Sequence, residues 1–193
     1  MRREIAKTML LAGAAAFVLS ACAVGGDRAA APSVFDLGPL AGAAVGPLPD
    51  LQPTEMSAPP WLASAGIAYR LAYQNEFQAL FYRDSRWAAP PAALLSERLR
   101  QKLAQGSRGV TSKPIALRLE LVEFEQRFSA PMQSEVRVSL RARLGEGSAA
   151  VQTFELVKPC RSADAAGAVR AFSEASDEAL AQVLAWATLK AKT

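Results

Sequence analysis

Residues 135–144, with the sequence EVRVSLRARL, alternate strictly between apolar and polar side chains. Successive side chains of a β-strand point to opposite faces, so this pattern predicts a strand with one apolar and one charged face. The apolar positions are Val136, Val138, Leu140, Ala142 and Leu144, and the polar positions are Glu135, Arg137, Ser139, Arg141 and Arg143. A sheet with such a strand has one face on a core and the other in water, which is typical of antiparallel pairing.

The preceding segment, residues 115–128, is the expected hairpin partner of this strand. Its apolar side chains follow one alternation up to Leu121 and the opposite one from Val122, which predicts a β-bulge at this step. Its glutamates face arginines across the predicted ladder, and each such pair contributes roughly 0.2–1 kcal/mol. We interpret this charged set as a solvated sheet surface; it comprises Glu120, Glu123, Glu125, Arg137, Arg141 and Arg143.

Further extended segments flank this pair. Residues 66–74 and 77–84 predict a hairpin that turns at Asn75 and Glu76. A short strand is expected at residues 34–38, a second extended piece near residues 48–51, and a strand at residues 151–158 that completes a meander.

Two segments have helical patterns. Residues 92–104 carry leucines at a spacing of four, after Pro91 and before Gly106. The second helix spans about residues 164–190, with Ser162 and Asp164 as candidate caps and an apolar stripe of Val169, Phe172, Ala179, Val183 and Ala187. Together the elements predict one α+β domain over residues 34–190, with a mixed, mainly antiparallel sheet and two principal helices packed on it.

The start of the chain has the layout of a secretory signal. A basic segment precedes an apolar run at residues 9–19, and two small residues precede Cys22. The run is too short for a spanning helix, which needs about 20 apolar residues. Leu19-Ser20-Ala21-Cys22 resembles the lipobox of bacterial lipoproteins, which implies a signal peptide at residues 1–21 and acylation of Cys22 by diacylglycerol and palmitate. The alternative is an ordinary secreted protein with a chance cysteine.

Residues 22–33 then form the lipidated N-terminus and a flexible linker. The twelve steps from Cys22 to Val34 span at most about 40 Å when fully extended. We therefore expect the folded domain to work close to the membrane that holds its lipid. Ala23 stands where an aspartate would signal retention at the inner membrane in many bacterial lipoproteins, so that resemblance favours the outer membrane.

The composition argues against most kinds of enzyme. The chain has no histidine, which excludes catalytic triads with histidine and metal sites with imidazole ligands. A glycosidase with two carboxylates would survive this test, but the glutamates lie at polar strand positions or beside basic residues. We expect no catalytic residues, cofactor or metal. Without residues 1–21, 19 basic and 17 acidic residues remain (22 − 3 and 18 − 1), and a net charge of +2 predicts no nucleic-acid partner. Cys160 is expected to be a half-buried thiol without a disulfide partner.

Several stretches resemble one family of lipoproteins. They are APPWLASAGIAYRLAY at residues 58–73, LFYRDSRWAAPPAALLSERLRQKL at 80–103, VFDLG at 34–38 and AVRAFSEASDEALAQVLAWA at 168–187. Their order and spacing are similar to those of the ABC-type transport auxiliary lipoproteins, the PqiC-like family. Ala88 and Ala89 depart from the pattern, because many relatives have an acidic residue before the prolines.

The resemblance implies a lipoprotein that is accessory to an ABC/Mce-type lipid transport system. Its partner would be an Mce/MlaD-domain (PqiB-like) protein, docked at the periplasmic face of the outer membrane, and the lipoprotein itself could be a homo-oligomeric ring. Candidate contacts with partner or cargo are Trp61, Tyr69, Arg86 and Trp87. For Arg86 and Trp87 we favour a role in holding the loop before the first helix.

Two other functions stay open at this point. A lipid carrier would need an apolar pocket of its own, for which Tyr69, Tyr73, Phe77, Phe81 and Phe124 are candidates. An enzyme would need a site without histidine.

Overall fold

The structure is a computed structural model of the chain, and it describes residues 30–40, 46–106, 114–146 and 150–192. The chain divides into two units, Met1–Ala31 and Pro32–Thr193, and all elements described below belong to the second. The predicted signal peptide, Cys22 and most of the predicted linker lie outside the described residues.

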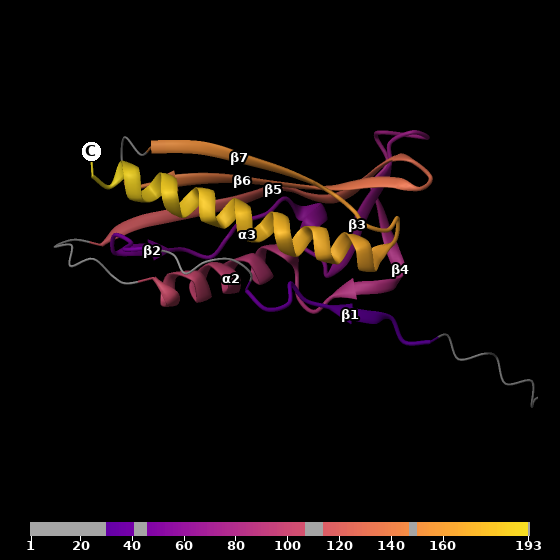
Figure 1. Cartoon of the computed structure of the whole chain (residues 1–193), viewed down its shortest axis with the longest axis horizontal. Coiled ribbons are helices and arrows are strands. Elements are labelled where there is room, and N and C mark those ends of the chain that lie inside the picture. Colours follow the sequence, from indigo (N-terminus) through magenta and orange to yellow (C-terminus); the bar gives the residue numbers. More distant parts are fainter. Residues whose placement is uncertain (1–29, 41–45, 107–113, 147–149, 193) are drawn as a thin grey trace, which may run out of the picture. The chain divides into compact units, whose positions relative to one another are not determined.

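A seven-stranded mixed sheet forms the framework of this unit (Figure 1). Its strands are β1 (Ser33–Phe35), β2 (Leu51–Pro53), β3 (Gly66–Leu71), β4 (Leu80–Trp87), β5 (Ile115–Ala130), β6 (Gln133–Leu144) and β7 (Ala150–Pro159). The order is β1-β4-β3-β5-β6-β7, and β2 also pairs with β5. The pairs β3/β4, β5/β6 and β6/β7 are antiparallel, whereas β1/β4, β2/β5 and β3/β5 are parallel.

The long strand β5 explains how two short strands share one edge. Its first residues pair with β2, from Ile115 opposite Leu51, and its later residues pair with β3, from Gln126 opposite Tyr69. Between them, Ser57 bridges to Glu120. Strand β5 has sixteen residues, which is long enough for β2 and β3 to pair with separate parts of it.

The predicted β-bulge is confirmed. The register between β5 and β6 shifts between Leu121 and Glu123, so Val122 is the extra residue. Apolar side chains on both sides of the bulge, Leu121 and Phe124, are buried as a result.

The predicted hairpin of β3 and β4 is also confirmed, but both strands are shorter at the turn than predicted. β3 ends at Leu71, and β4 begins at Leu80 and not at Phe77. The backbone N–H of Phe77 donates to Asn75 Oδ1 at 3.0 Å, which holds Phe77 in the turn.

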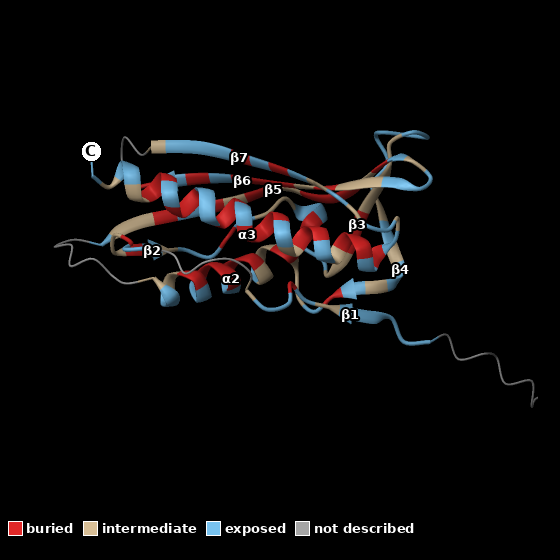
Figure 2. Cartoon of the chain, viewed as in Figure 1, coloured by how far each residue is buried: buried red, intermediate tan, exposed pale blue. Residues whose placement is uncertain are grey.

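The two predicted helices are present as α2 (Pro91–Gln105) and α3 (Ala165–Lys190), beside a short 3₁₀ helix, η2 (Pro60–Leu62). Asp164 caps α3 by accepting the N–H of Gly167 at 2.7 Å. Figure 1 shows α3 running along the sheet, and Figure 2 shows buried residues recurring along both α2 and α3. The α+β fold class is therefore confirmed.

The core between helices and sheet contains a group of aromatic rings. Phe124 of β5 stacks on Phe172 of α3 with ring centroids 4.2 Å apart, and Trp87 of β4 packs against both rings. At the other end of α3, Trp186 meets the Phe154 ring of β7 at 5.9 Å. These contacts fix the helix along its length, because large aromatic side chains dominate the energetics of a core.

Candidate functional site

The first element after the predicted linker is the three-residue strand β1. It pairs with the end of β4, with Ser33 opposite Ser85 and Phe35 opposite Trp87. After β1 the chain turns at Gly38, whose φ is +66° and whose N–H donates to Asp36 Oδ1. Three residues of strand pairing attach β1 to β4 only weakly, so contacts of the segment after β1 are needed to hold this part of the chain on the domain.

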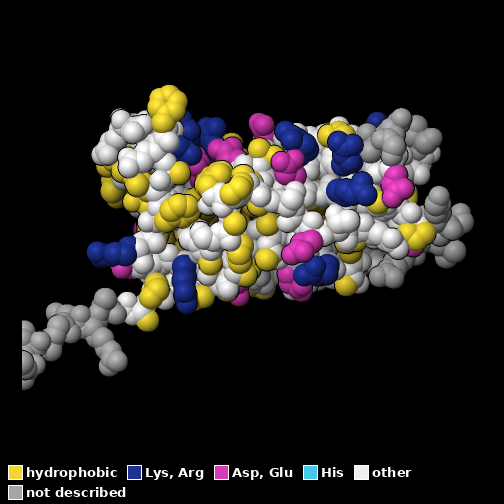
Figure 3. All heavy atoms as spheres, turned by 180° about the vertical axis from the view of Figure 1, so that it is seen from behind, with side chains coloured by type: hydrophobic (Ala, Val, Ile, Leu, Met, Phe, Trp, Pro, Cys, Tyr) yellow, Lys and Arg dark blue, Asp and Glu magenta, His cyan; other side chains and the backbone are white. Residues whose placement is uncertain are grey.

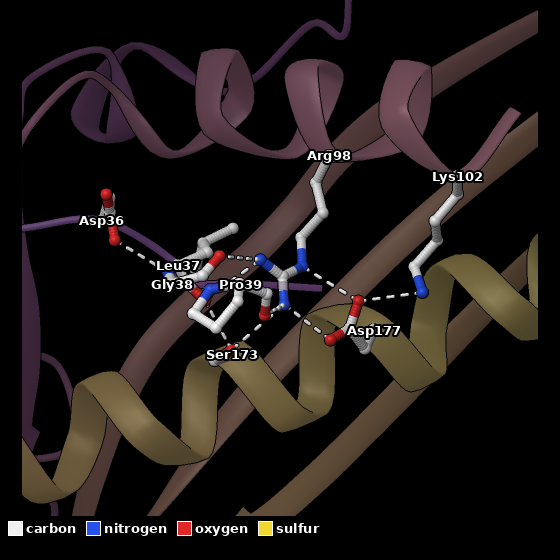
Figure 4. A network of polar contacts seen from close by, with 8 residues as sticks. All are labelled: Asp36, Leu37, Gly38, Pro39, Arg98, Lys102, Ser173 and Asp177. Atoms are coloured by element: carbon white, nitrogen blue, oxygen red, sulfur yellow. Dashed lines mark hydrogen bonds and ion pairs between the residues drawn. The ribbon is translucent and has the colours of Figure 1, made fainter. Parts of the chain in front are cut away.

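Arg98 of α2 holds that segment, as Figure 4 shows. Its Nη1 donates to the carbonyl oxygens of Leu37 and Gly38 at 3.0 and 2.9 Å, and its Nη2 donates to that of Pro39 at 3.2 Å. Ser173 of α3 also donates to the Leu37 carbonyl, at 2.6 Å. Three successive carbonyl groups are therefore satisfied by side chains from the two helices.

Asp177 of α3 neutralises the charges of two cations from α2. Arg98 Nε lies 2.9 Å from Asp177 Oδ1, and the same oxygen lies 2.9 Å from Lys102 Nζ. The side chains of Arg98, Lys102 and Asp177 are 3%, 7% and 10% exposed, so all three charged groups are almost fully desolvated. Such a group fixes geometry, because a buried charge without its partner is costly. We call Arg98, Lys102, Ser173, Asp177 and the carbonyls of residues 37–39 the clamp.

A surface hollow of about 550 Å³ lies next to the clamp. Its walls come from β1 and the segment after it, including Phe35 and Leu37, and from α3, including Val169 and Arg170. It is mainly apolar, and it lies where the chain enters the fold.

The four candidate contact residues lie in different environments. Trp61 on η2 is 37% exposed, and Arg86 on β4 is exposed. Tyr69 on β3 is half-buried between Tyr82 and Phe128, with ring centroids 4.7 and 6.0 Å away. Trp87 is 1% exposed and belongs to the aromatic core. The structure does not bring the four together into one surface, and contact with a partner or cargo stays a prediction for each.

The five aromatic residues considered for a carrier pocket also lie in different parts of the domain. Phe124 lies in the core, Tyr69 packs on other rings, and Tyr73, Phe77 and Phe81 are exposed by 41%, 88% and 44%. In the part of the chain that the structure describes, these five side chains do not surround a common cavity.

The predicted charge lattice is correct for one pair and wrong for another. Glu120 and Arg141 form the expected bridge at 3.1 Å on the exposed sheet surface. Glu125 was expected in water but is 2% exposed, and both its oxygens accept from Arg70 of β3 at 2.8 Å. The reason is the parallel pairing of β3 with β5, which brings Arg70 beside Glu125 from 55 residues away.

Two titratable groups of the described residues, Glu123 and Cys160, have raised pKa values. Burial raises the pKa of Glu123, and the nearby Glu125 carboxylate raises it further. Burial also raises the pKa of the Cys160 thiol, which accepts a hydrogen bond from Gln126 at 3.7 Å and is half-buried as predicted. A raised thiol pKa lowers the reactivity of a cysteine at neutral pH. Among the described residues no group of three or more Asp, Glu or Cys is placed to hold a metal ion.

Within the described ranges, no helix is both long enough and apolar enough to cross a membrane.

Sequence reasoning missed the clamp. A signal for it exists in α2, where Arg98 and Lys102 are four residues apart and adjacent to the apolar positions Leu95 and Leu99. The partner could not be found in this way, because Asp177 is 79 residues from Arg98 in the sequence.

Comparison with known proteins gives one family and several similar structures. A family model described as ABC-type transport auxiliary lipoprotein component matches residues 41–184. The crystal structure of protein XCC0632 from Xanthomonas campestris, of family DUF330, superimposes with a TM-score of 0.64 at 20% identity, over 84% of this chain and 95% of that chain. A second crystal structure, of an uncharacterized protein, gives a TM-score of 0.62 at 18% identity, over 81% and 98% of the two chains. No curated protein matches this chain. At these identities the two structures are evidence for the fold alone.

Proposed function

Because the chain belongs to the family of ABC-type transport auxiliary lipoprotein components, we propose that it is the lipid-anchored periplasmic subunit of an ABC/Mce-type lipid transport system. In this role it docks an Mce/MlaD-domain (PqiB-like) protein at the outer membrane. An auxiliary component of transport is not an enzymatic role. The family match over residues 41–184 is the observation that carries the proposal.

The clamp supports an anchored role. Lipid at Cys22 would transmit any load on the fold through residues 22–33 into β1, and the clamp fastens the chain directly after β1. A guanidinium group that donates to three successive carbonyls resists displacement of that segment better than three residues of strand pairing alone. A tethered protein that holds a partner needs such a fixed point.

The short reach of the linker supports docking over shuttling. Twelve steps from Cys22 to Val34 span at most about 40 Å. The domain therefore stays near its own membrane, and the partner must cross the remaining distance. The carrier alternative gains no support from the five aromatic side chains considered for a pocket, because they are dispersed between core and surface.

Affinity capture from membranes tests the proposal. The full chain with an affinity tag at its C-terminus is expressed beside the Cys22→Ala variant, and co-purified proteins and lipids are identified by mass spectrometry. Cys160→Ala is the matched control, since it removes the other cysteine and leaves the lipobox intact. We expect wild type and Cys160→Ala to capture an Mce-domain protein and Cys22→Ala to lose it.

Two results would contradict docking. Capture of stoichiometric lipid without an Mce-domain protein would favour the carrier. Equal capture by Cys22→Ala and wild type would show that the anchor is not needed for the partner contact.

A further inference from the structure

Two turns lie together at one end of the sheet. β3 and β5 run parallel, with Leu71 opposite Phe128, so the turn after β3 and the turn after β5 follow at the same end. An ion pair between Glu76 and Arg127, at 3.6 Å, connects the first turn to the end of β5. The two turns contain the most exposed large apolar side chains of the described residues, Phe77 at 88% and Met132 at 82%. We call Tyr73, Phe77 and Met132 the apolar tip.

The turn that carries Phe77 is well ordered by hydrogen bonds. The N–H groups of Gln74 and Asn75 both donate to the Leu71 carbonyl at 2.9 Å, and Asn75 Oδ1 accepts from Phe77. Arg70 Nη1 donates to the Glu76 carbonyl at 2.8 Å. The polar groups around the turn are thus paired within the protein, while the apolar side chains project outward.

Single exposed apolar residues are common on proteins, but a projecting group of them marks a contact surface. Figure 3 shows hydrophobic side chains gathered at this end of the molecule, at its left in that view, with one projecting from the upper left. Phe77 and Met132 contribute little to the hydrophobic core, since both side chains are almost fully exposed.

The path of the chain brings the start of β1 to the same side of the sheet as the tip. β1 is parallel to β4, and β4 begins directly after the tip turn, so the chain enters β1 from the side of the tip. Ser33 lies beside Ser85, five residues into β4 from Leu80, which is at most about 17 Å along the strand. The eleven steps from Ser33 back to Cys22 (33 − 22) span at most about 40 Å. The membrane that holds a lipid on Cys22 is therefore within reach of the tip.

We propose that the apolar tip inserts into the interface of the phospholipid membrane that anchors Cys22, as a second contact beside the lipid. This inference rests on the proposed function for the lipid at Cys22. Aromatic side chains and other large apolar groups settle in the region between headgroups and acyl chains. Two attachments, the lipid on Cys22 and the apolar tip, hold the domain in a defined orientation on the membrane, which an eleven-step tether alone does not.

Tryptophan fluorescence in vesicles tests this contact. The lipidated full chain is reconstituted into vesicles of phosphatidylethanolamine and phosphatidylglycerol in which part of the lipid carries bromine on its acyl chains. Phe77→Trp and Met132→Trp each add one reporter to the three native tryptophans, and wild type gives the background. We expect the added tryptophans to be quenched by brominated lipid and to emit at shorter wavelength than in detergent-free buffer without vesicles.

Leu189→Trp is the matched control. Leu189 is apolar and 68% exposed, but it lies near the end of α3, beyond Trp186, which packs on Phe154. From Ala165 to Leu189 the helix rises about 36 Å, away from the tip end. A tryptophan at position 189 is expected to escape quenching. Equal quenching at 77, 132 and 189, or quenching at none of them, would overturn the proposal; in the second case the tip is left for a protein partner.

The intact mass of the same sample separates this proposal from the docking function. Lipid on Cys22 without quenching at positions 77 and 132 overturns the tip contact and leaves docking unaffected. Quenching at these positions without lipid on Cys22 supports insertion of the tip but overturns its role as a second contact, and it removes the anchor from the docking proposal. Absence of both overturns both.

Discussion

The clamp and the apolar tip differ in which kind of side chain is buried and which is exposed. The clamp buries charged groups, and each charge meets a partner inside the protein. The apolar tip exposes large hydrophobic groups, while the polar atoms of its turns are paired internally. Both arrangements cost free energy unless something compensates. Among the described residues, the charges of the clamp are compensated by ion pairs, whereas the side chains of the apolar tip stay exposed.

This difference separates stability from function. A feature that is complete within the chain contributes to folding, so its loss should appear in unfolding experiments. A substitution in an exposed apolar group should leave the free energy of unfolding unchanged and weaken binding to whatever the group contacts. Substitutions in the two regions can therefore be compared directly.

Asp177→Asn should have the largest effect on stability. It keeps the shape of the side chain but removes the carboxylate charge that pairs with both Arg98 and Lys102. Breaking a buried ion pair in this way costs about 3–5 kcal/mol of unfolding free energy. Urea denaturation followed by circular dichroism measures the loss.

Glu178→Gln is the control for that prediction. Glu178 is the next residue on α3 and pairs with Lys158, but its side chain is 44% exposed. Exposed pairs contribute about 0–1 kcal/mol. If both variants lost the same stability, the clamp would have no special role.

Glu125→Gln should be the next most destabilising change. The side chain of Glu125 is 3% exposed and accepts two hydrogen bonds from Arg70, whose side chain is 16% exposed. Water can partly solvate the released guanidinium group, so we expect a loss of about 2 kcal/mol in the same urea experiment. Glu120→Gln, at the exposed pair with Arg141, should lose less than about 1 kcal/mol. A loss at Glu125 no larger than at Glu120 would contradict burial of this bridge.

Phe77→Ser should leave stability nearly unchanged. Phe77 is 88% exposed, and surface substitutions away from caps and cores usually alter unfolding free energy by less than about 0.5 kcal/mol. The matched core variant is Phe124→Ala, for which about 3–5 kcal/mol is expected. Thermal unfolding of both chains checks the contrast, and a strongly destabilised Phe77→Ser would place the tip in the fold and not at a contact surface.

Glu123→Gln should have the smallest effect, and its size depends on pH. The pKa of Glu123 is raised in the fold, first by burial and then by Glu125, so ionisation disfavours the folded state. The wild type therefore loses stability as pH rises through the ordinary and then the raised pKa. At pH 7 the variant should be more stable by less than about 0.5 kcal/mol, a value reduced for solvent screening because the group is only half-buried.

Below the ordinary pKa of a glutamate, the carboxyl is protonated in both states and this advantage should disappear. Urea denaturation at pH 7 and at pH 3.5 measures both conditions. A Glu123→Gln variant that is less stable than wild type at pH 7 would contradict the raised pKa.

The local features of this fold could be predicted from the sequence. The bulge at Val122 follows from a change in the apolar alternation, and the two helices follow from periodic leucines and from the cap at Asp164. The parallel pairings could not be predicted, because the pattern of β3 contains no information about which part of β5 it joins. The burial of Glu125 depends on that pairing, and for this reason its predicted exposure was wrong.

The site features were harder to predict for a related reason. The clamp joins residues 37–39, 98, 102, 173 and 177, which meet only after the two helices have packed together. Phe77 was predicted at the start of a strand and considered for a cargo pocket, but the Asx turn at Asn75 holds it outside the strand. Cys22 was found from sequence alone, and its acylation stays a prediction.

Both regions acquire their proposed roles from a lipid at Cys22, and the intact mass of the chain extracted from membranes tests that anchor most directly. We expect the mass of residues 22–193, which are 172 residues after removal of 21 from 193, increased by one diacylglyceryl group and one further acyl chain. The Cys22→Ala chain should lack this increase. A wild-type chain that retains residues 1–21, or that is cleaved at another position without added lipid, would contradict the anchored function.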